Sequence, residues 1–132
     1  MIACRCLIPV SHGELVDKIT ILEIKANYAS GLALDHVIEE LSHLRQALAG
    51  LAMPLDLDSL IVLQQELKAV NQVLWEIEDR LRRMEHGRQF DDEFIQLARQ
   101  VYRYNDKRAA IKRRVNQYFG SAIWEEKIYS CV

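Results

Sequence analysis

Apolar residues recur at steps of three and four along most of the chain, the spacing that places side chains on one face of an α-helix. The longest such run is unbroken and consists of Leu60, Leu63, Leu67, Val70, Leu74, Ile77, Leu81 and Met84. Regular alternation of the two steps is typical of a helix that packs along another helix in a coiled coil. The pattern therefore predicts a helix over residues 59–86, with Gly87 ending it.

Start and stop signals predict three more helices, over residues 12–30, 35–51 and 92–119. Ser11 and Glu14 have the spacing of a capping box, in which the serine caps the first helix and the glutamate reaches back to it. Asp91 is expected to cap the start of the last helix. Gly31 is expected to end the first helix, and Gly120 the last.

Short breaks separate these helices, so consecutive helices are expected to run antiparallel. The two longest, over residues 59–86 and 92–119, are predicted to form a long coiled-coil hairpin on which the first two helices lie. The chain is thus predicted to be one domain, residues 1–132, with an all-α fold: an antiparallel up-down helical bundle. The end segments, residues 2–8 and 127–132, look extended and are expected to pair at one end of the bundle.

Composition narrows the classes of function. The chain has 132 residues, of which 50% are hydrophobic and 27% charged, and a net charge of -2. These values suit one soluble domain, and no apolar run approaches the roughly 18–20 residues that a membrane-spanning helix needs. A basic stripe on the last helix consists of Arg99, Arg103, Lys107 and Arg114, but no recognition motif accompanies it. We therefore expect neither a nucleic-acid partner nor a membrane partner.

The N-terminal residues are apolar, but Arg5 and Pro9 interrupt them too early for a signal peptide. A cytoplasmic location with reduced thiols is therefore expected. The cysteines, Cys4, Cys6 and Cys131, lack the fourth ligand and the two-residue spacing of a typical zinc site. Their role stays open.

A second metal pattern also falls short. Glu40 and His43 have the spacing found in carboxylate-bridged di-iron bundles. Such a site needs a second Glu-x-x-His sequence, and the chain has none. A solvated helix face explains these residues better, so we expect no metal and no cofactor.

Polar residues interrupt the apolar faces of the helices and predict a polar layer inside the bundle. Its members, taken as candidate ligand-binding residues, are Glu14, Lys18, Asn71, Glu78, Asn105, Arg108 and Lys112. On the first helix, this arrangement would leave Val16 and Thr20 pointing outward.

An unpaired buried charge costs several kcal/mol, so Arg108 and Lys112 must meet carboxylates or an anion from outside. Glu78 is a poor partner for Arg108, because the two are displaced along the hairpin by roughly 13 Å. The nearer acidic candidates are Glu14, Asp17, Glu125 and Glu126. Two interpretations stay open: a closed network that fixes the register of the helices, or a small anion held by Arg108, Lys112 and Lys18.

Four blocks of the sequence resemble domain-of-unknown-function family 6165, short proteins chiefly of bacteria. They read IPVSHGELVDKITILEIK, ELKAVNQVLWEIED, FIQLARQVYRYNDKRAAIKRRVN and GSAIWEEKIY, and together they cover nearly the whole chain apart from the second helix. The resemblance implies a shared all-helical fold and a bacterial protein. It implies no activity, so no catalytic residue is carried over, although every candidate residue of the polar layer falls within these blocks.

Two classes of function therefore stay open, and the question of catalysis with them. The first is a non-enzymatic helical scaffold or adaptor that forms a homodimer or binds a protein partner, because the seams are long and the first helix has more apolar surface than one neighbour needs. The second is a protein or enzyme that binds a small anionic metabolite in the polar layer. We favour the scaffold.

Overall fold

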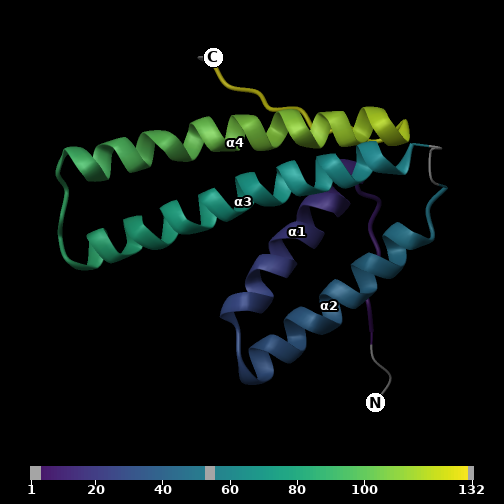
Figure 1. The fold of residues 1–132 in the computed structure, drawn as a ribbon, viewed down its shortest axis with the longest axis horizontal. Helices are drawn as coiled ribbons and strands as arrows, with labels where there is room; N and C mark the ends of the chain where they lie inside the picture. Colours follow the sequence, from purple (N-terminus) through teal and green to yellow (C-terminus); the bar gives the residue numbers. More distant parts are fainter. Residues whose placement is uncertain (1–3, 53–55, 131–132) are drawn as a thin grey trace.

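The computed structural model describes residues 4–52 and 56–130 (Figure 1). Within these ranges the chain forms four helices and no strand, which confirms the predicted all-α fold. The helices are α1 (His12–Tyr28), α2 (Gly31–Ala49), α3 (Leu57–His86) and α4 (Asp92–Phe119). None of them, within the described ranges, is long and apolar enough to cross a membrane.

The helix ends follow the local signals closely. The Ser11 side chain accepts a hydrogen bond from the backbone N–H of Glu14 at 3.0 Å, and Asp91 caps α4 in the same way. Gly120 adopts the left-handed conformation, with φ of 65°, directly after α4. Gly31 is the exception: it begins α2 instead of ending α1, because the extended residues before it already form the connection between the two helices.

Two helical hairpins meet at one end of the molecule (Figure 1). The long hairpin consists of α3 and α4, and the short one of α1 and α2. α1 packs against all three other helices, whereas α2 packs on α1 and not along the long hairpin. The prediction that both of the first two helices lie on the long hairpin is therefore wrong for α2, because α1 separates it from α3 and α4. The half of the long hairpin that carries its turn therefore extends past the short hairpin, with no third described helix against it (Figure 1).

α1 is the most enclosed helix. Val16 lies in a core cluster with residues of α3 and α4, namely Leu63, Leu67, Ile111 and Val115. A second cluster joins the opposite side of α1 to α2. Val16 and Thr20 are fully buried, so the prediction that both point outward is wrong. The error arises because neighbours cover more of this helix than a single apolar face would require.

The described parts of the two ends lie against different helices. Arg5 lies within hydrogen-bond distance of His43 on α2. The C-terminal residues 121–130, termed the strap, run back along α4, where Lys127 pairs with Asp106 at 2.6 Å. The expected pairing between the ends is therefore absent from the described residues. Residues 1–3 and 131–132, including Cys131, lie outside the described residues.

Candidate functional site

A fully buried carboxylate, that of Asp17 on α1, lies where α1 crosses the long hairpin. Arg108 on α4 donates two hydrogen bonds to it, from Nε to Oδ1 at 3.0 Å and from Nη2 to Oδ2. Asn71 on α3 donates to the same Oδ1 at 2.8 Å and to Thr20 Oγ1 at 2.9 Å. The carboxylate therefore joins three helices, and its hydrogen bonds offset the cost of its burial.

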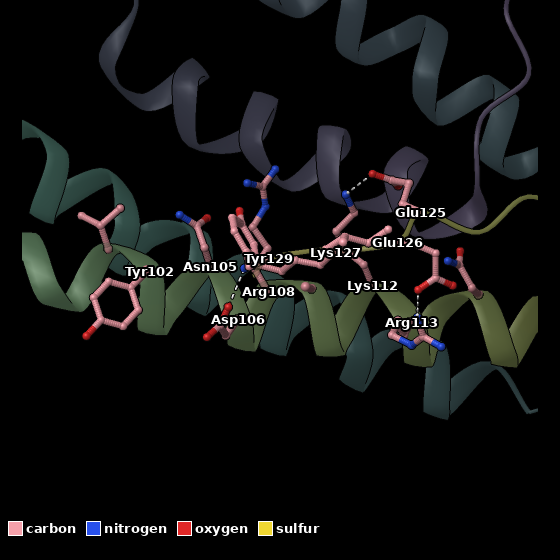
Figure 2. Close-up of a pocket in the computed structure, with 14 residues that line it drawn as sticks. Tyr102, Asn105, Asp106, Arg108, Lys112, Arg113, Glu125, Glu126, Lys127 and Tyr129 are labelled. Atoms are coloured by element: carbon pink, nitrogen blue, oxygen red, sulfur yellow. Dashed lines mark hydrogen bonds and ion pairs between the residues drawn. The ribbon is translucent and has the colours of Figure 1, made fainter. Parts of the chain in front are cut away.

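Lys112 extends this arrangement toward the surface. Its Nζ lies 2.7 Å from Glu14 and 3.9 Å from Asp17. It also lies 3.2 Å from Glu125 (Figure 2). Ser11 donates a hydrogen bond to Glu125 at 2.9 Å, which ties the strap to the start of α1. We term these residues the Asp17 network: Ser11, Glu14, Asp17, Thr20, Asn71, Arg108, Lys112 and Glu125.

Both cations of the Asp17 network are paired with carboxylates inside it. Three carboxylates face the two cations, Arg108 and Lys112, and each cation has a carboxylate partner within hydrogen-bond distance. Hydrogen bonds to Asp17 raise the pKa of Arg108 against the opposing effect of burial. Burial lowers the pKa of Lys112, but its bonds to Glu14 and the nearby Asp17 outweigh that effect and raise it overall. Both cations therefore stay charged, as a network of ion pairs requires.

The start of α1 approaches the backbone of α4 unusually closely. The N–H of Gly13 donates to the Asn116 side chain at 2.6 Å, which satisfies one of the free donors of the first helical turn. A Cβ atom at Gly13 would lie 2.5 Å from the carbonyl oxygen of Lys112. Glycine is therefore required for the approach that brings Glu14 and Asp17 to their cations.

The strap and α4 enclose an open groove of about 960 Å³ beside the Asp17 network. Figure 2 shows its charged walls, in which Arg113 pairs with Glu126 at 3.2 Å and Lys127 pairs with Asp106. The apolar part of the lining consists of Val101, Tyr102, Ala109, Ile128 and Tyr129. Four basic and three acidic side chains line the groove, but each basic one is paired with a carboxylate, Arg108 with the buried Asp17. The groove therefore offers an anion no unpaired cation among its lining residues.

The structure brings together four of the seven candidate residues: Glu14, Asn71, Arg108 and Lys112. Asn105 is half-buried and lines the groove. Lys18 is exposed, because it lies about 100° around α1 from Asp17, on the side that the long hairpin leaves uncovered. The prediction that it belongs to an interior layer is wrong.

Glu78 is also misplaced by the prediction. It is exposed and lies 4.0 Å from Arg82 on its own helix. It shares a face of α3 with Asn71 but stands about two turns nearer the hairpin turn, beyond Trp75, on which Tyr28, the last residue of α1, stacks.

Sequence reasoning named Asp17 and Glu125 only as acids that could lie near the cations, and it missed Thr20, Gly13 and Asn116. A signal for Asp17 was present, since the residue falls on the same side of α1 as Ile21 and Ile24. The pairing of Gly13 with Asn116 has no such local signal, because it depends on how closely two helices approach.

A family model matches residues 7–132, nearly the whole chain. The chain belongs to DUF6165, a family of unknown function. The comparisons find no curated protein and no solved structure that matches it. The matched range contains the whole Asp17 network, so DUF6165 membership covers the candidate site, and it assigns that site no activity.

A pH dependence is expected from Glu125. Burial raises its pKa, but hydrogen bonds from Ser11 and Lys112 outweigh that effect and hold it below the ordinary value of 4.5. The stabilisation from a lowered pKa is present above the ordinary value and is lost as the pH falls through the folded-state pKa. We expect Glu125→Gln to destabilise the protein at pH 7 by less than about 1 kcal/mol, because the side chain is half-exposed.

The difference between this variant and the wild type should shrink as the pH falls below about 4.5, which urea unfolding at several pH values would measure. Glu85→Gln, at an exposed position near the hairpin turn, serves as the control. An unchanged difference between Glu125→Gln and the wild type at pH 7 and at about pH 3 would contradict the assigned role of the strap.

Proposed function

We propose that this protein is a non-enzymatic helical scaffold or adaptor that self-associates as a homodimer. One observation carries the proposal. The residues from Asp92 to Ala110, all of them described, include none that is buried, although they contain a run of large apolar side chains. Ile95 and Tyr102 are 50% and 54% exposed, and the side chains that face α3 are only partly covered.

A hairpin of only two helices leaves these apolar side chains exposed to water, which is unfavourable. Burying apolar surface against a partner is favourable by roughly 25 cal/mol of free energy for each Å² removed from water. Helical stability in proteins comes mainly from packing an apolar face, and bundles commonly do so with four helices. A second copy of the long hairpin supplies the two missing helices, and closed two-fold pairing is the commonest form of self-association.

The Asp17 network supports a structural role. Its carboxylates outnumber its cations, and those cations are already paired. Lys18, the third cation that an anion site would need, is exposed on another side of α1. These observations support a structural network that holds α1 against the long hairpin better than they support the second candidate, a site for a small anionic metabolite.

Sedimentation equilibrium tests the proposal. We expect the mass to rise from that of one chain toward that of two as the concentration increases from about 0.1 to about 100 µM, a range that spans typical homodimer affinities. A mass of one chain throughout would refute self-association. If, in addition, small anions such as phosphate and citrate raised the melting temperature, the second candidate would replace the scaffold.

A further inference from the structure

Residues seven positions apart are almost two helical turns apart and so share a face. On α4, Lys112 meets α1, and Ala98 lies fourteen positions before it. On α3, Asn71 meets α1, and Glu78 follows seven positions later. The face that holds α1 therefore continues, uncovered, toward the hairpin turn. We term this continuation the open face, and its residues are Trp75 at its edge, beside Tyr28 of α1, followed by Glu78, Arg82, Phe94 and Ala98.

We propose that the open face binds the open face of a second copy across a two-fold axis, with the two long hairpins antiparallel. The turn of each hairpin then lies in the angle between the two hairpins of the other copy. This inference rests on the proposed self-association and assigns the surface that carries it out.

In this arrangement, acidic and basic side chains of α3 lie opposite side chains of opposite charge on α3 of the second copy. Glu78 and Arg82 are four residues apart, with side chains that are 52% and 84% exposed. An axis level with residue 80 sets Glu78 opposite Arg82 of the second copy, and the reverse. Both residues can thus exchange a weak ion pair within one helix for ion pairs between copies, which favour one register over others.

The same axis meets a small residue on α4. Ion pairs between the helices, Glu66 with Arg114 and Arg80 with Glu93, set residue 80 of α3 level with residues 93 to 100 of α4. Ala98 lies in that interval on the open face. A small side chain where two helices cross permits the close end of the usual 8–10 Å separation. Phe94, which is partly covered, lies one turn before Ala98 on the same face and supplies apolar contact.

In this arrangement, the hairpin turn of each copy also lies against an aromatic pair of the other copy. The hairpin turn lies eight or nine residues after residue 80. The two-fold axis sets it opposite the position that lies as far before residue 80 in the second copy, which is near Gln72. Gln72 contacts Tyr28, whose ring stacks on Trp75 with centroids 5.0 Å apart. Phe90, which is 55% exposed at the turn, would therefore meet this aromatic pair in the second copy.

The surface area that a stable dimer must bury also favours a second copy, rather than a single helix or a peptide, as the partner. The open part of the long hairpin is about 24 Å long and about 20 Å wide, or about 480 Å² of flat face. Stable interfaces bury about 800 Å² on each partner. The open face alone is therefore too small for a stable interface, and a partner must also contact the short hairpin. In the proposed arrangement, the hairpin turn of the second copy makes that contact.

Ala98→Glu tests the inference, with Ala110→Glu as the matched control. Both alanines are exposed on α4, but Ala110 lies on another side of the helix. A carboxylate at position 98 would be desolvated between the copies without a partner. We expect the dimer dissociation constant, measured by sedimentation equilibrium, to rise at least about 100-fold for Ala98→Glu and less than about threefold for the control.

A charge exchange provides a second test. Glu78→Arg should raise the dissociation constant about tenfold, because the new side chain faces Arg82 of the second copy, and adding Arg82→Glu should restore it. Circular dichroism confirms that each variant is folded. A wild-type dimer that Ala98→Glu and Glu78→Arg leave unchanged would overturn this interface but not the self-association. A wild type with the mass of one chain at every concentration would overturn both.

Discussion

Asp17→Asn is expected to lower the free energy of unfolding by about 3 kcal/mol, the lower end of the range for breaking a buried ion pair. Asparagine fills the same volume but carries no charge, so Arg108 would keep its burial and lose its counter-ion. If its nitrogen replaced Oδ2, the new amide would also present a donor to Arg108 Nη2, which cannot accept a hydrogen bond. Because 30% of the Arg108 side chain is exposed, water compensates part of this loss.

Urea unfolding at pH 7, followed by circular dichroism, measures the change. The control is Asp79→Asn on α3, which breaks an exposed ion pair with Arg83 and should cost less than about 0.5 kcal/mol. Adding Arg108→Met to Asp17→Asn removes the unpaired cation and should recover part of the lost stability. Wild-type stability for Asp17→Asn would mean that the Asp17 network does not hold α1 in place.

Gly13→Ala should cost about 2–3 kcal/mol, although alanine is the better helix former by about 1 kcal/mol. The new Cβ would lie 2.5 Å from the backbone oxygen of Lys112, and backbone cannot move aside as the end of a side chain can. α1 would have to shift from α4, which would also stretch the hydrogen bond from Gly13 to Asn116. The expected sign is therefore opposite to that of helix propensity.

The matched control is Gly50→Ala at the end of α2. A Cβ there would lie 3.5 Å from its nearest neighbour, an ordinary contact, and the backbone is right-handed. Its free energy of unfolding should equal that of the wild type or exceed it by up to about 1 kcal/mol. If urea unfolding found Gly13→Ala as stable as this control, the close approach of α1 to α4 would be refuted.

Most of the fold could be predicted from local patterns. The leucine run of α3 predicted its length, and Ser11 and Asp91 predicted where α1 and α4 begin, because a cap forms its hydrogen bond within a few residues. Gly31 misled the prediction, since a glycine with positive φ can begin one helix as readily as it ends another.

The candidate site could be predicted only in part. Arg108 and Lys112 stand out because they interrupt the apolar face of a helix, a feature visible in the sequence. Lys18 was chosen and Thr20 rejected because the two apolar stripes of α1 allow more than one buried side. Which side is covered depends on where α3 and α4 lie, and helical periodicity contains no information on that.

The sequence by itself determined the number of helices, their approximate ends and the need to neutralise two interior cations, because these depend on local hydrogen bonding and on periodicity. Only the tertiary structure decided that Asp17 neutralises Arg108, that Glu125 reaches Lys112 from the strap, and that half of the long hairpin lies open. These features depend on the angle and distance at which separate helices cross, which residues far apart in the chain determine together.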